Sequence, residues 1–590
     1  MLSFDFMRPL HGMAFVCCLL LNAAPAMAAD KLLPASLRRP RGLALSTDEA
    51  TLYAANRRSG TLSIIDLSKQ NTVREISLGK QLSDLQRIPG RSVLLATDES
   101  AHELLLLKIA GLEVTCAQRL AVSPYPVSVV TTRDGRHCVV ASLWSQRLTF
   151  VELPAGENGE ARVVGSLDMP FAPRCQLLVK NDSVLLVADS FGGRLAIIDV
   201  AARRIVHIRE FPGHNIRGMA TNVDGTMLVV AHQMLNELAH TVRNDVHWGL
   251  LMSNDLRWLK LDAVLDAKAD MYDGAHMHPL GQAGNATGDP AGLFMSSKGN
   301  VVVSLGGVGE VAVGKEEDFS LNRIRVGKRP TAVIVNHAGT RAYVANTFDD
   351  SVSIIDLKEQ EVLDTISLGP QSELSLADRG ELLFYNARLS HDSWMSCNSC
   401  HTEGHTNGLL NDNFSDASFG APKRVLSLLG RANTAPFAWN GSAATFKDQI
   451  RKSITNTMQA DDPPTDEQLT LLAAFVETLQ PPPSIDVARG VQDKAAVARG
   501  KALFHALKCV ACHQPPVFTS ADTYDVGLED KLGRHRFNPP TLRGVGQRGP
   551  YFHDNRATSL DEVFSKFHHQ LDRELSNDEL TDLLSFLRSL

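Results

Sequence analysis

Short hydrophobic runs alternate with turn residues along the chain from residue 38 to residue 370. Runs of Val, Ile and Leu are separated by Gly, Asp, Asn and Ser, which is typical of short strands joined by tight turns. The first and last units match closely, since Tyr53-Ala-Ala-Asn56 in one corresponds to Tyr343-Val-Ala-Asn346 in the other. This self-similarity indicates a repeat architecture.

Seven such units are recognisable, starting near residues 38, 81, 124, 172, 214, 281 and 329. Each unit has the pattern of four short strands. One small sheet cannot bury both of its faces, so the units must stack radially and close into a ring. The sequence therefore predicts an N-terminal all-β seven-bladed propeller over residues 38–370.

The fifth unit carries an insertion, around residues 232–278, that is too long for an ordinary blade. It is rich in histidine and tryptophan: His232, His240, His247, Trp248, Trp258, His276 and His278. Two interpretations are open. The segment packs as surface loop and sheet edge, or it covers the cofactor of a neighbouring domain, because long loops often carry function. His276-Met-His278 resembles a metal site with an incomplete ligand set.

Beyond residue 371 the hydrophobic period changes to that of helices. Ser576 and Glu579 have the spacing of a capping box. A leucine stripe follows on one helical face: Leu580, Leu583, Leu584 and Leu587. A similar helix ends near Leu479, and a proline linker at 481–483 follows it. We predict a mainly α region of two units, residues 376–480 and 484–590.

The first 28 residues have the pattern of a cleavable signal peptide. An apolar run over residues 13–21 leads to Ala26-Met27-Ala28, the small-x-small pattern of a cleavage site. About ten apolar residues are too few for a membrane anchor, and no later segment offers the run of roughly 18 that a spanning helix needs. We expect export to the periplasm without a membrane span.

The charge of the chain limits its possible partners, and the number of cysteines limits its possible disulfide bonds. The 590 residues carry a formal net charge of −7 and no long Lys/Arg run, which argues against a nucleic-acid partner. Nine cysteines are present, two of them inside the predicted signal peptide. Cys116, Cys138 and Cys175 are scattered along the propeller, and their odd number leaves at least one unpaired. The sequence does not choose between the three pairings.

The other four cysteines form two Cys-x-x-Cys-His motifs: Cys397, Cys400 and His401, and Cys509, Cys512 and His513. In this motif the two thiols attach c-type haem covalently and the adjacent histidine binds the iron. A zinc site or a redox Cys-x-x-Cys would not explain the histidine after both pairs. We predict two covalently bound haem c groups, with His401 and His513 as iron ligands.

Residues 379–590 resemble the bacterial di-haem cytochrome c peroxidase family, which includes the MauG-type oxidases. The matching stretches are residues 380–390, 435–441, 540–544, 549–554 and 559–563. The resemblance implies that the N-terminal haem reacts with peroxide, that the C-terminal haem is six-coordinate and passes electrons, and that Trp439 lies between them. The propeller repeats resemble the YVTN family of bacterial β-propellers, a resemblance of fold alone.

Two positions depart from the peroxidase pattern. Gln459 stands where family members carry an acid–base glutamate, and an amide cannot shuttle the proton that peroxide cleavage requires. Asp461 and Asp462 are the neighbouring substitutes. The second axial ligand of the C-terminal haem aligns with Phe567, which cannot bind iron, so the resemblance assigns that place to His568 or His569.

The surroundings of the first haem also differ from the family. No second axial histidine precedes Trp439, which implies a distal site that is open or supplied by the propeller. His405, four residues after His401, is expected at a haem propionate or at the surface. Arg548 stands where the family often has a threonine beside an inter-haem calcium ion, so a calcium site finds no support here.

We expect a periplasmic di-haem c oxidoreductase of the cytochrome c peroxidase/MauG type, in which electrons pass between two haems. Its substrate would be H2O2, or a docked protein or small molecule that H2O2 serves to oxidise. A small cytochrome c or copper protein would donate the electrons. The alternative is a non-enzymatic electron-transfer or haem-based binding protein whose propeller recognises a partner. Gln459 argues against the plain peroxidase, and the fused propeller favours docking.

Overall fold

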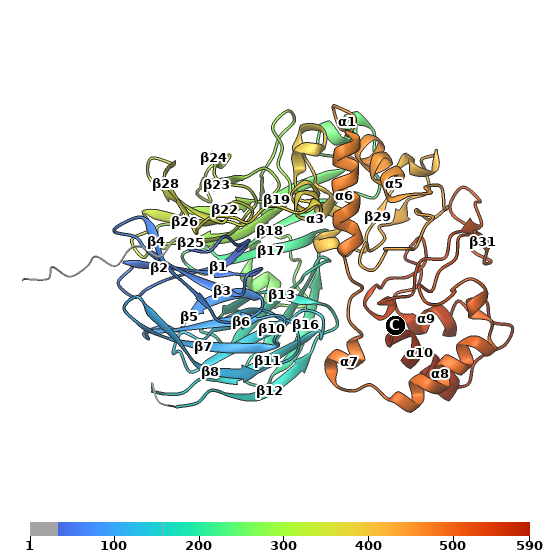
Figure 1. Cartoon of the computed structure of the whole chain (residues 1–590), viewed down its shortest axis with the longest axis horizontal. Helices are drawn as coiled ribbons and strands as arrows, with labels where there is room; N and C mark the ends of the chain where they lie inside the picture. The colour runs from blue at the N-terminus through green and yellow to red at the C-terminus, as the bar shows by residue number, and fades with distance from the viewer. Residues whose placement is uncertain (1–32, 157–158) are drawn as a thin grey trace, which may run out of the picture.

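The computed structural model describes residues 33–156 and 159–590. A ring of sheets formed by the N-terminal part lies beside a helical region formed by the C-terminal part (Figure 1). The predicted signal peptide, residues 1–28, falls outside the described residues. Within them, none of the helices combines the length and the apolar composition needed to cross a lipid bilayer.

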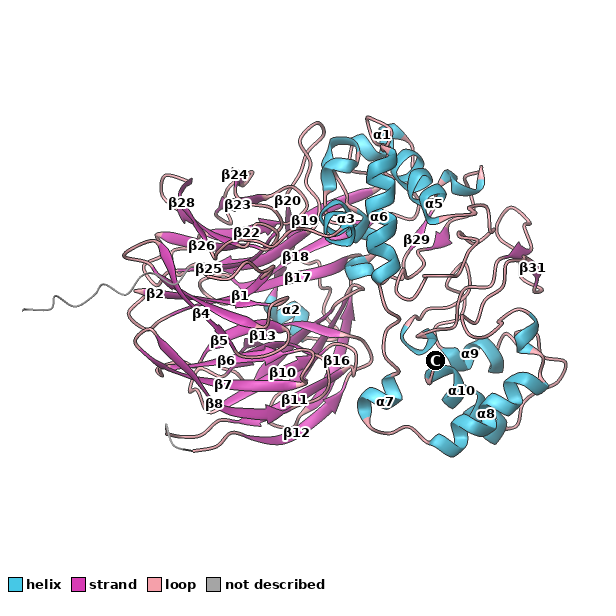
Figure 2. Cartoon of the chain, in the orientation of Figure 1, coloured by secondary structure: helices cyan, strands magenta, loops and turns pink. Residues whose placement is uncertain are grey.

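The described N-terminal part forms seven antiparallel four-stranded sheets, each built from four consecutive strands, which confirms the seven-bladed propeller (Figure 2). The innermost strands are β1 (Pro40–Leu45), β5 (Leu82–Arg87), β9 (Pro126–Thr131), β13 (Pro173–Val179), β17 (His214–Thr221), β21 (Pro290–Met295) and β25 (Pro330–Val335). The sixth blade thus begins at Pro290, later than the predicted start near residue 281.

The outer strands follow in chain order: β2 (Thr51–Asn56), β3 (Thr61–Asp66), β4 (Asn71–Ser77), β6 (Val93–Asp98), β7 (Glu103–Ala110), β8 (Glu113–Ala121), β10 (His137–Ser142), β11 (Arg147–Glu152), β12 (Arg162–Asp168), β14 (Val184–Asp189), β15 (Arg194–Asp199), β16 (Arg204–Glu210), β18 (Met227–Leu235), β19 (Met252–Lys260), β20 (His276–Pro279), β22 (Val301–Leu305), β23 (Glu310–Gly314), β24 (Asn322–Arg325), β26 (Arg341–Asn346), β27 (Ser351–Asp356) and β28 (Glu361–Ser367). Every residue of β2 is buried, because neighbouring blades cover both of its faces. Apolar contacts between blades form the core, as where Tyr53 packs with Leu94 and Leu105 of the next blade.

The ring closes between the first and last blades through packing and terminal contacts rather than through a shared sheet. Strand β1 lies beside β25. The backbone N–H groups of Arg38 and Arg39 donate to the Asp350 carboxylate at 2.9 and 2.7 Å. The buried Arg38 guanidinium donates to Pro370 O at 2.9 Å and to the Glu75 carboxylate at 2.7 Å. A short segment before β1 therefore holds the two ends of the ring together.

The fifth-blade insertion is smaller than predicted, because β19 and β20 lie within it. The extra segments are the loop with α1 (Arg243–His247) between β18 and β19, and α2 (Leu261–Leu265) between β19 and β20. On the blade, Trp258 Nε1 donates to His278 Nδ1 at 2.9 Å and the Trp258 ring stacks on His276. His276 and His278 therefore pack as part of the sheet.

The cysteine question is also settled by the fold. Cys116, Cys138 and Cys175 are all unpaired. Cys138 is buried in the apolar layer between the second and third blades, where burial raises the pKa of its thiol. The pairings left open by the sequence do not form.

The C-terminal region is mainly helical (Figure 2). Its helices are α3 (Leu376–Phe384), α4 (Cys397–Cys400), α5 (Phe446–Lys452), α6 (Asp466–Thr478), α7 (Ile485–Arg489), α8 (Lys494–Ala506), α9 (Leu560–Ser565) and α10 (Asn577–Arg588). Short helical turns and strands complete it: η1 (Ala387–Leu389), η2 (His391–Ser393), η3 (Thr402–Gly404), β29 (Leu410–Asn411), η4 (Phe414–Asp416), β30 (Lys423–Arg424), η5 (Ser453–Thr457), η6 (Cys509–Ala511), β31 (Tyr524–Asp525), β32 (Arg536–Phe537) and η7 (Val545–Gln547). The predicted Ser576–Glu579 capping box is present at the start of α10.

Two pairs of crossed helices in this region each have a glycine at the crossing point. Helix α3 packs on α6 at Gly380, where an added Cβ would lie 1.9 Å from the Leu471 carbonyl oxygen. Helix α8 packs on α10 at Gly500, where a Cβ would lie 1.9 Å from the Asp582 carbonyl oxygen. Only glycine allows backbones to approach this closely. The two halves of the region are therefore built alike, each around one crossed helix pair.

Candidate haem centre

The first Cys-x-x-Cys-His motif lies at the wall of an apolar cavity of about 210 Å³. Cys397 and Cys400 are the first and last residues of α4, and His401 follows directly. Burial of the His401 ring lowers its pKa to about 4, and its buried Nδ1 has no hydrogen-bond partner. Two thiols and a neutral imidazole facing an apolar cavity are what attachment and ligation of haem require.

The second motif lines a larger cavity of about 480 Å³. Cys509 begins η6, and His513 follows Cys512. His513 Nδ1 lies 3.2 Å from the Phe518 carbonyl oxygen, so that nitrogen carries the proton and Nε2 keeps its lone pair for a metal. Burial lowers the pKa of His513 to about 4, which keeps the ring neutral as a ligand must be.

Only one of the two candidate axial histidines reaches this cavity. His569 lines it together with His513, and its Nδ1 is buried without a hydrogen-bond partner. Burial lowers the pKa of His569 to about 4. His568 is exposed to solvent and adopts a left-handed backbone conformation, with φ 45°. The turn at His568 thus directs the following histidine, rather than His568 itself, toward the second cavity.

Trp439 stands between the two cavities and lines both. Its ring is buried, and its Nε1 donates to the Arg424 carbonyl oxygen at 2.8 Å, which fixes the ring plane. The ring therefore lies between the two candidate haem sites, and its role between two haem groups stays a prediction. Arg424, Leu426 and Arg431 also line both cavities.

A cluster of buried arginines accompanies Trp439. Burial lowers the pKa values of Arg424 and Arg431 to about 10, and burial together with these two neighbours holds the pKa of Arg548 well below its ordinary value. The Nε atoms of Arg424 and Arg548 are buried without a hydrogen-bond partner. Buried cations of this kind need anions. The propionate carboxylates of haem in the two cavities fit that need, and the residues present therefore suit the group.

Comparison with known proteins agrees with this arrangement. Residues 375–481 match the family model of di-haem cytochrome c peroxidase, and residues 497–590 match the model of cytochrome c. The C-terminal region is that of a di-haem c oxidoreductase. As cytochrome c domains, its two units imply haem c as the cofactor.

Relatives of known name align with the same part of the chain. A cytochrome c551 peroxidase of Nitrosomonas europaea is 29% identical over 269 residues, which cover 36% of this chain and 79% of the relative. A methylamine utilization protein MauG of Methylophilus methylotrophus is 27% identical over 281 residues, covering 37% and 82%. Among solved structures, Kuenenia stuttgartiensis hydrazine synthase aligns over 55% of this chain and 97% of its own, at 19% identity and a TM-score of 0.48, too low to carry an argument.

Gln459 lies near the di-haem region's first cavity without lining it. Its backbone has φ 51°, and its side-chain nitrogen donates to the carbonyl oxygens of Thr241 in the propeller and of Asn456, at 2.7 and 2.8 Å. Its acid–base role stays a prediction. Asp461, one of the neighbouring substitutes, lies 2.9 Å from His391 Nδ1 and also pairs with Arg243.

Gln449 is a site residue that the sequence did not reveal. It lines the first cavity from α5, and its side-chain oxygen is buried there without a hydrogen-bond partner. Its side-chain nitrogen donates to Ser453 Oγ at 3.3 Å. The amide oxygen is therefore free to accept a hydrogen bond from a molecule in the cavity. No motif marks this glutamine, since one amide in a helix has no spacing signature.

Among the described residues, the propeller supplies none to the first cavity, because all of the lining comes from the di-haem region between Phe384 and Val476. The expected surface position of His405 is wrong, and its expected place at a haem propionate stays a prediction. His405 is buried, with Nδ1 3.0 Å from Ser427 Oγ and Nε2 3.0 Å from the Gln547 carbonyl oxygen. Its ring packs on Trp144 and Phe191 of the propeller. His405 therefore joins the propeller to both cytochrome units.

The α1 segment of the fifth blade packs against the first cytochrome unit without lining its cavity, so the interpretation that the insertion covers the cofactor stays a prediction. Val246 and Leu251 share an apolar cluster with Trp394, and Trp394 Nε1 donates to the His247 carbonyl oxygen at 3.1 Å. His247 Nδ1 lies 2.6 Å from the Asp392 carboxylate. The insertion thus supports the layer that carries Met395 and Cys397, one layer removed from the cavity itself.

Proposed function

We propose that the chain is a periplasmic di-haem c oxidoreductase that reduces H2O2, or uses it to oxidise a docked substrate, with electrons passing between two covalently bound haem c groups. The observation that carries this proposal is the pair of cavities, each with a Cys-x-x-Cys-His motif on its wall and with Trp439 shared between them. An aromatic ring common to both sites is a short path for an electron between them.

Each residue has a definite task in this proposal. Thioether bonds from Cys397 and Cys400, and from Cys509 and Cys512, fix the haem groups, while His401 and His513 bind iron. His569 would be a further iron ligand in the C-terminal unit. Bound haem would supply the redox chemistry, namely reaction with peroxide in the first unit and exchange of electrons in the second.

The chain's own groups govern access and protons. In the first cavity the Gln449 amide oxygen accepts a hydrogen bond from a hydroperoxide or water molecule and orients it. Arg424 and Arg431 hold anionic groups between the two sites. The mostly apolar wall limits water near the first site. Gln449 orients that molecule without supplying protons, since an amide cannot donate and recover a proton as a carboxyl group does.

The electron donor in this proposal is a small cytochrome c or a copper protein. The redox names of the relatives support a partner of this class. A protein or small molecule docked on the propeller is the second candidate substrate, since the propeller packs directly on the unit that carries the first motif.

The test uses the full chain matured with haem in a periplasm. Intact mass should show two covalent haem groups, and Cys509→Ala/Cys512→Ala should lose one of them. The ferric spectrum should contain one high-spin and one low-spin species, and H2O2 should be consumed when a reduced small cytochrome c is present. Gln449→Ala should lower peroxide turnover about tenfold, the loss expected for one hydrogen bond to the reacting molecule. Two low-spin haem groups and no reaction with H2O2 would exclude this function.

One observation favours the non-enzymatic alternative. Met395 and Met458 are buried and line the first cavity, and a methionine thioether can occupy an iron coordination site. A six-coordinate first haem would make the protein an electron-transfer or haem-based binding protein with the propeller as its partner-recognition module. Met458→Ala and Met395→Ala should then convert a low-spin species to high-spin. Unchanged spectra in both variants would remove this alternative.

A further inference from the structure

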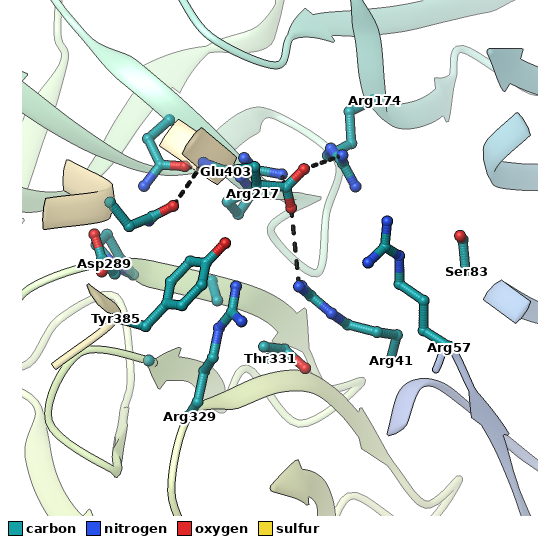
Figure 3. Close-up of a pocket in the computed structure, with 15 residues that line it drawn as sticks. Arg41, Arg57, Ser83, Arg174, Arg217, Asp289, Arg329, Thr331, Tyr385 and Glu403 are labelled. Atoms are coloured by element: carbon teal, nitrogen blue, oxygen red, sulfur yellow. Dashed lines mark hydrogen bonds and ion pairs between the residues drawn. The ribbon is translucent and has the colours of Figure 1, made fainter. Parts of the chain in front are cut away.

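A separate cavity of about 140 Å³ lies at the centre of the propeller, where the first cytochrome unit meets the ring (Figure 3). Five arginines line it: Arg41, Arg57, Arg174, Arg217 and Arg329. They come from the first, fourth, fifth and seventh blades, mostly on or beside the innermost strands. Because these strands converge on the axis, guanidinium groups far apart in the sequence point into one space.

A single carboxylate from the cytochrome unit enters this ring. Glu403 lies on η3, two residues after His401. Arg174 Nη2 donates to its carboxylate at 2.6 Å, and Arg217 Nη1 lies 3.3 Å from it. Arg41 Nη2 lies 3.9 Å away. The loop that carries the first haem-attachment motif is therefore tied to the propeller axis by charge.

The remaining arginines have partners of their own. Arg57 donates through Nε and Nη2 to the Glu99 carboxylate at 3.0 and 2.9 Å. The Arg329 guanidinium lies over the Tyr385 ring, 3.2 Å from its centroid, and 3.9 Å from Glu381. Arg41, Arg174 and Arg217 are thus left to share Glu403. Three guanidinium charges against one carboxylate leave two positive charges unmatched.

The other acidic group that lines the cavity does not cancel this excess. Asp289 accepts hydrogen bonds from the hydroxyl groups of Ser396 and Ser399. Burial raises the pKa of its carboxyl group. Its engaged oxygens therefore hold the haem-attachment turn rather than the arginines.

The arginines also have unmet hydrogen-bonding capacity. Arg217 Nη2 is buried and has no hydrogen-bond partner. Burial, reinforced by neighbouring arginines, lowers the pKa of Arg217 to about 10 and that of Arg41 to about 9. Holding like charges together away from water is costly unless an anion joins them. The cavity is therefore incomplete as it stands in the protein alone.

We propose that this cavity is a binding site for a small doubly charged oxyanion of the phosphate or sulfate class, held by Arg41, Arg174 and Arg217. The charge of such an ion equals the unmatched excess, and guanidinium groups recognise oxyanions through paired N–H donors. The cavity volume of about 140 Å³ leaves ample room for a five-atom ion.

Solvent ions can reach these side chains, since Arg41 and Arg174 each keep 19% of their side-chain surface exposed. The bound ion and Glu403 draw on the same guanidinium donors. The site is independent of the reaction proposed above, because it requires neither peroxide nor electron transfer.

The test is isothermal titration calorimetry on the haem-loaded full chain with sodium phosphate and, separately, sodium sulfate, at constant ionic strength set by sodium chloride. Saturable binding of one ion per chain is expected for at least one of the two. Arg217→Gln and Arg41→Gln should each weaken binding by about tenfold or more, since each removes a charged donor. Arg133→Gln is the matched control, because Arg133 is 72% exposed on a propeller loop, and it should bind as the wild type does.

Glu403→Gln makes the test specific. It removes the competing carboxylate, so binding should tighten by about threefold or more, the opposite of what damage to the fold would cause. If Arg217→Gln does not fold, Arg41→Gln and Glu403→Gln carry the same comparison. Absence of saturable binding for both ions, or unchanged affinity in the arginine variants, would overturn the proposal.

Discussion

The assignment of His569 as an iron ligand leads to a sharp prediction, because an adjacent histidine serves as its control. His569→Ala removes a partly buried imidazole whose buried Nδ1 has no hydrogen-bond partner. His568→Ala removes an exposed imidazole one residue earlier in the same turn. The two variants make the same chemical change at neighbouring positions, so only the direction of each side chain distinguishes them.

The expected magnitudes follow from burial. Truncating a large buried side chain to alanine costs about 2–5 kcal/mol of the free energy of unfolding, through lost contacts and the cavity left behind. Because the His569 side chain is only partly buried, His569→Ala should fall at the lower end of that range. His568→Ala should change the free energy of unfolding by no more than about 0.5 kcal/mol, as exposed positions do.

The assay is the ferric and ferrous absorption spectrum of the haem-loaded chain, followed by chemical unfolding of each variant. His569→Ala should convert one low-spin species to high-spin, and added imidazole should restore the low-spin spectrum by filling the vacated position. His568→Ala should leave the spectrum unchanged. The reasoning fails if His568→Ala gives the spectral change, or if neither variant does.

Three further predictions concern Trp439 between the two cavities, Glu403 at the propeller axis, and the loss of stability at low pH that His232 causes. Trp439→Phe keeps an aromatic ring but loses the hydrogen bond to Arg424 O, so it should cost about 1 kcal/mol of stability and slow electron transfer between the haem groups in mixed-valence stopped-flow measurements; an unchanged rate would remove Trp439 from the path. Burial opposes ionisation of Glu403, but the surrounding arginines outweigh it and hold its pKa well below the usual range. Glu403→Gln should therefore lower the free energy of unfolding in urea by about 2 kcal/mol at low phosphate, less than for a wholly buried pair because the carboxylate keeps some solvent contact; no loss would show that the ion pairs are neutral in effect. Burial and the nearby Arg257 lower the pKa of His232 from 6.5 to about 3, so the folded protein favours the neutral ring. The resulting stability is complete above pH 6.5 and declines as pH falls toward 3, by about 2 kcal/mol between pH 6.5 and 5; His232→Gln should flatten this decline, and a profile parallel to that of the wild type would contradict the assignment.

The propeller could be predicted because its information is local and repeated. Each unit carries its own strands and turns, so one well-formed unit identifies the others. The fifth blade shows where this fails. Strands β19 and β20 are separated by a helix-bearing segment, and their hydrophobic pattern alone does not distinguish blade from insertion.

The two Cys-x-x-Cys-His motifs could also be recognised in the sequence, since their spacing is fixed by the chemistry of one bond-forming turn. The second axial ligand could not be chosen from the sequence. The choice between His568 and His569 depends on one left-handed backbone residue, which no side-chain pattern announces. Gln459 shows the same limit, because its φ of 51° and its contact with Thr241 depend on the propeller beside it.

The arginine ring at the propeller axis lay wholly beyond sequence reasoning. Arg41, Arg174 and Arg217 belong to different blades and are separated by more than a hundred residues in the first case. Each alone is an ordinary charged residue at the start of a strand. Only closure of the ring brings them together around Glu403. Sites built by symmetry of this kind have no linear motif.

Because every blade is made of four consecutive strands, no covalent link crosses between the seventh blade and the first. The hydrogen bonds of Arg38 and Arg39 with Asp350 and Pro370 join the seventh blade to the segment before the first. A proteolytic cut before Ser36 leaves these hydrogen bonds intact. A cut just after Arg39 removes them without deleting any blade strand, because β1 begins at Pro40. These hydrogen bonds also affect the contact between Arg41 and Glu403 near the first haem-attachment motif. Widening of the ring there would move Arg41 away from Arg174 and Arg217, which would still hold the Glu403 carboxylate of the loop that follows His401.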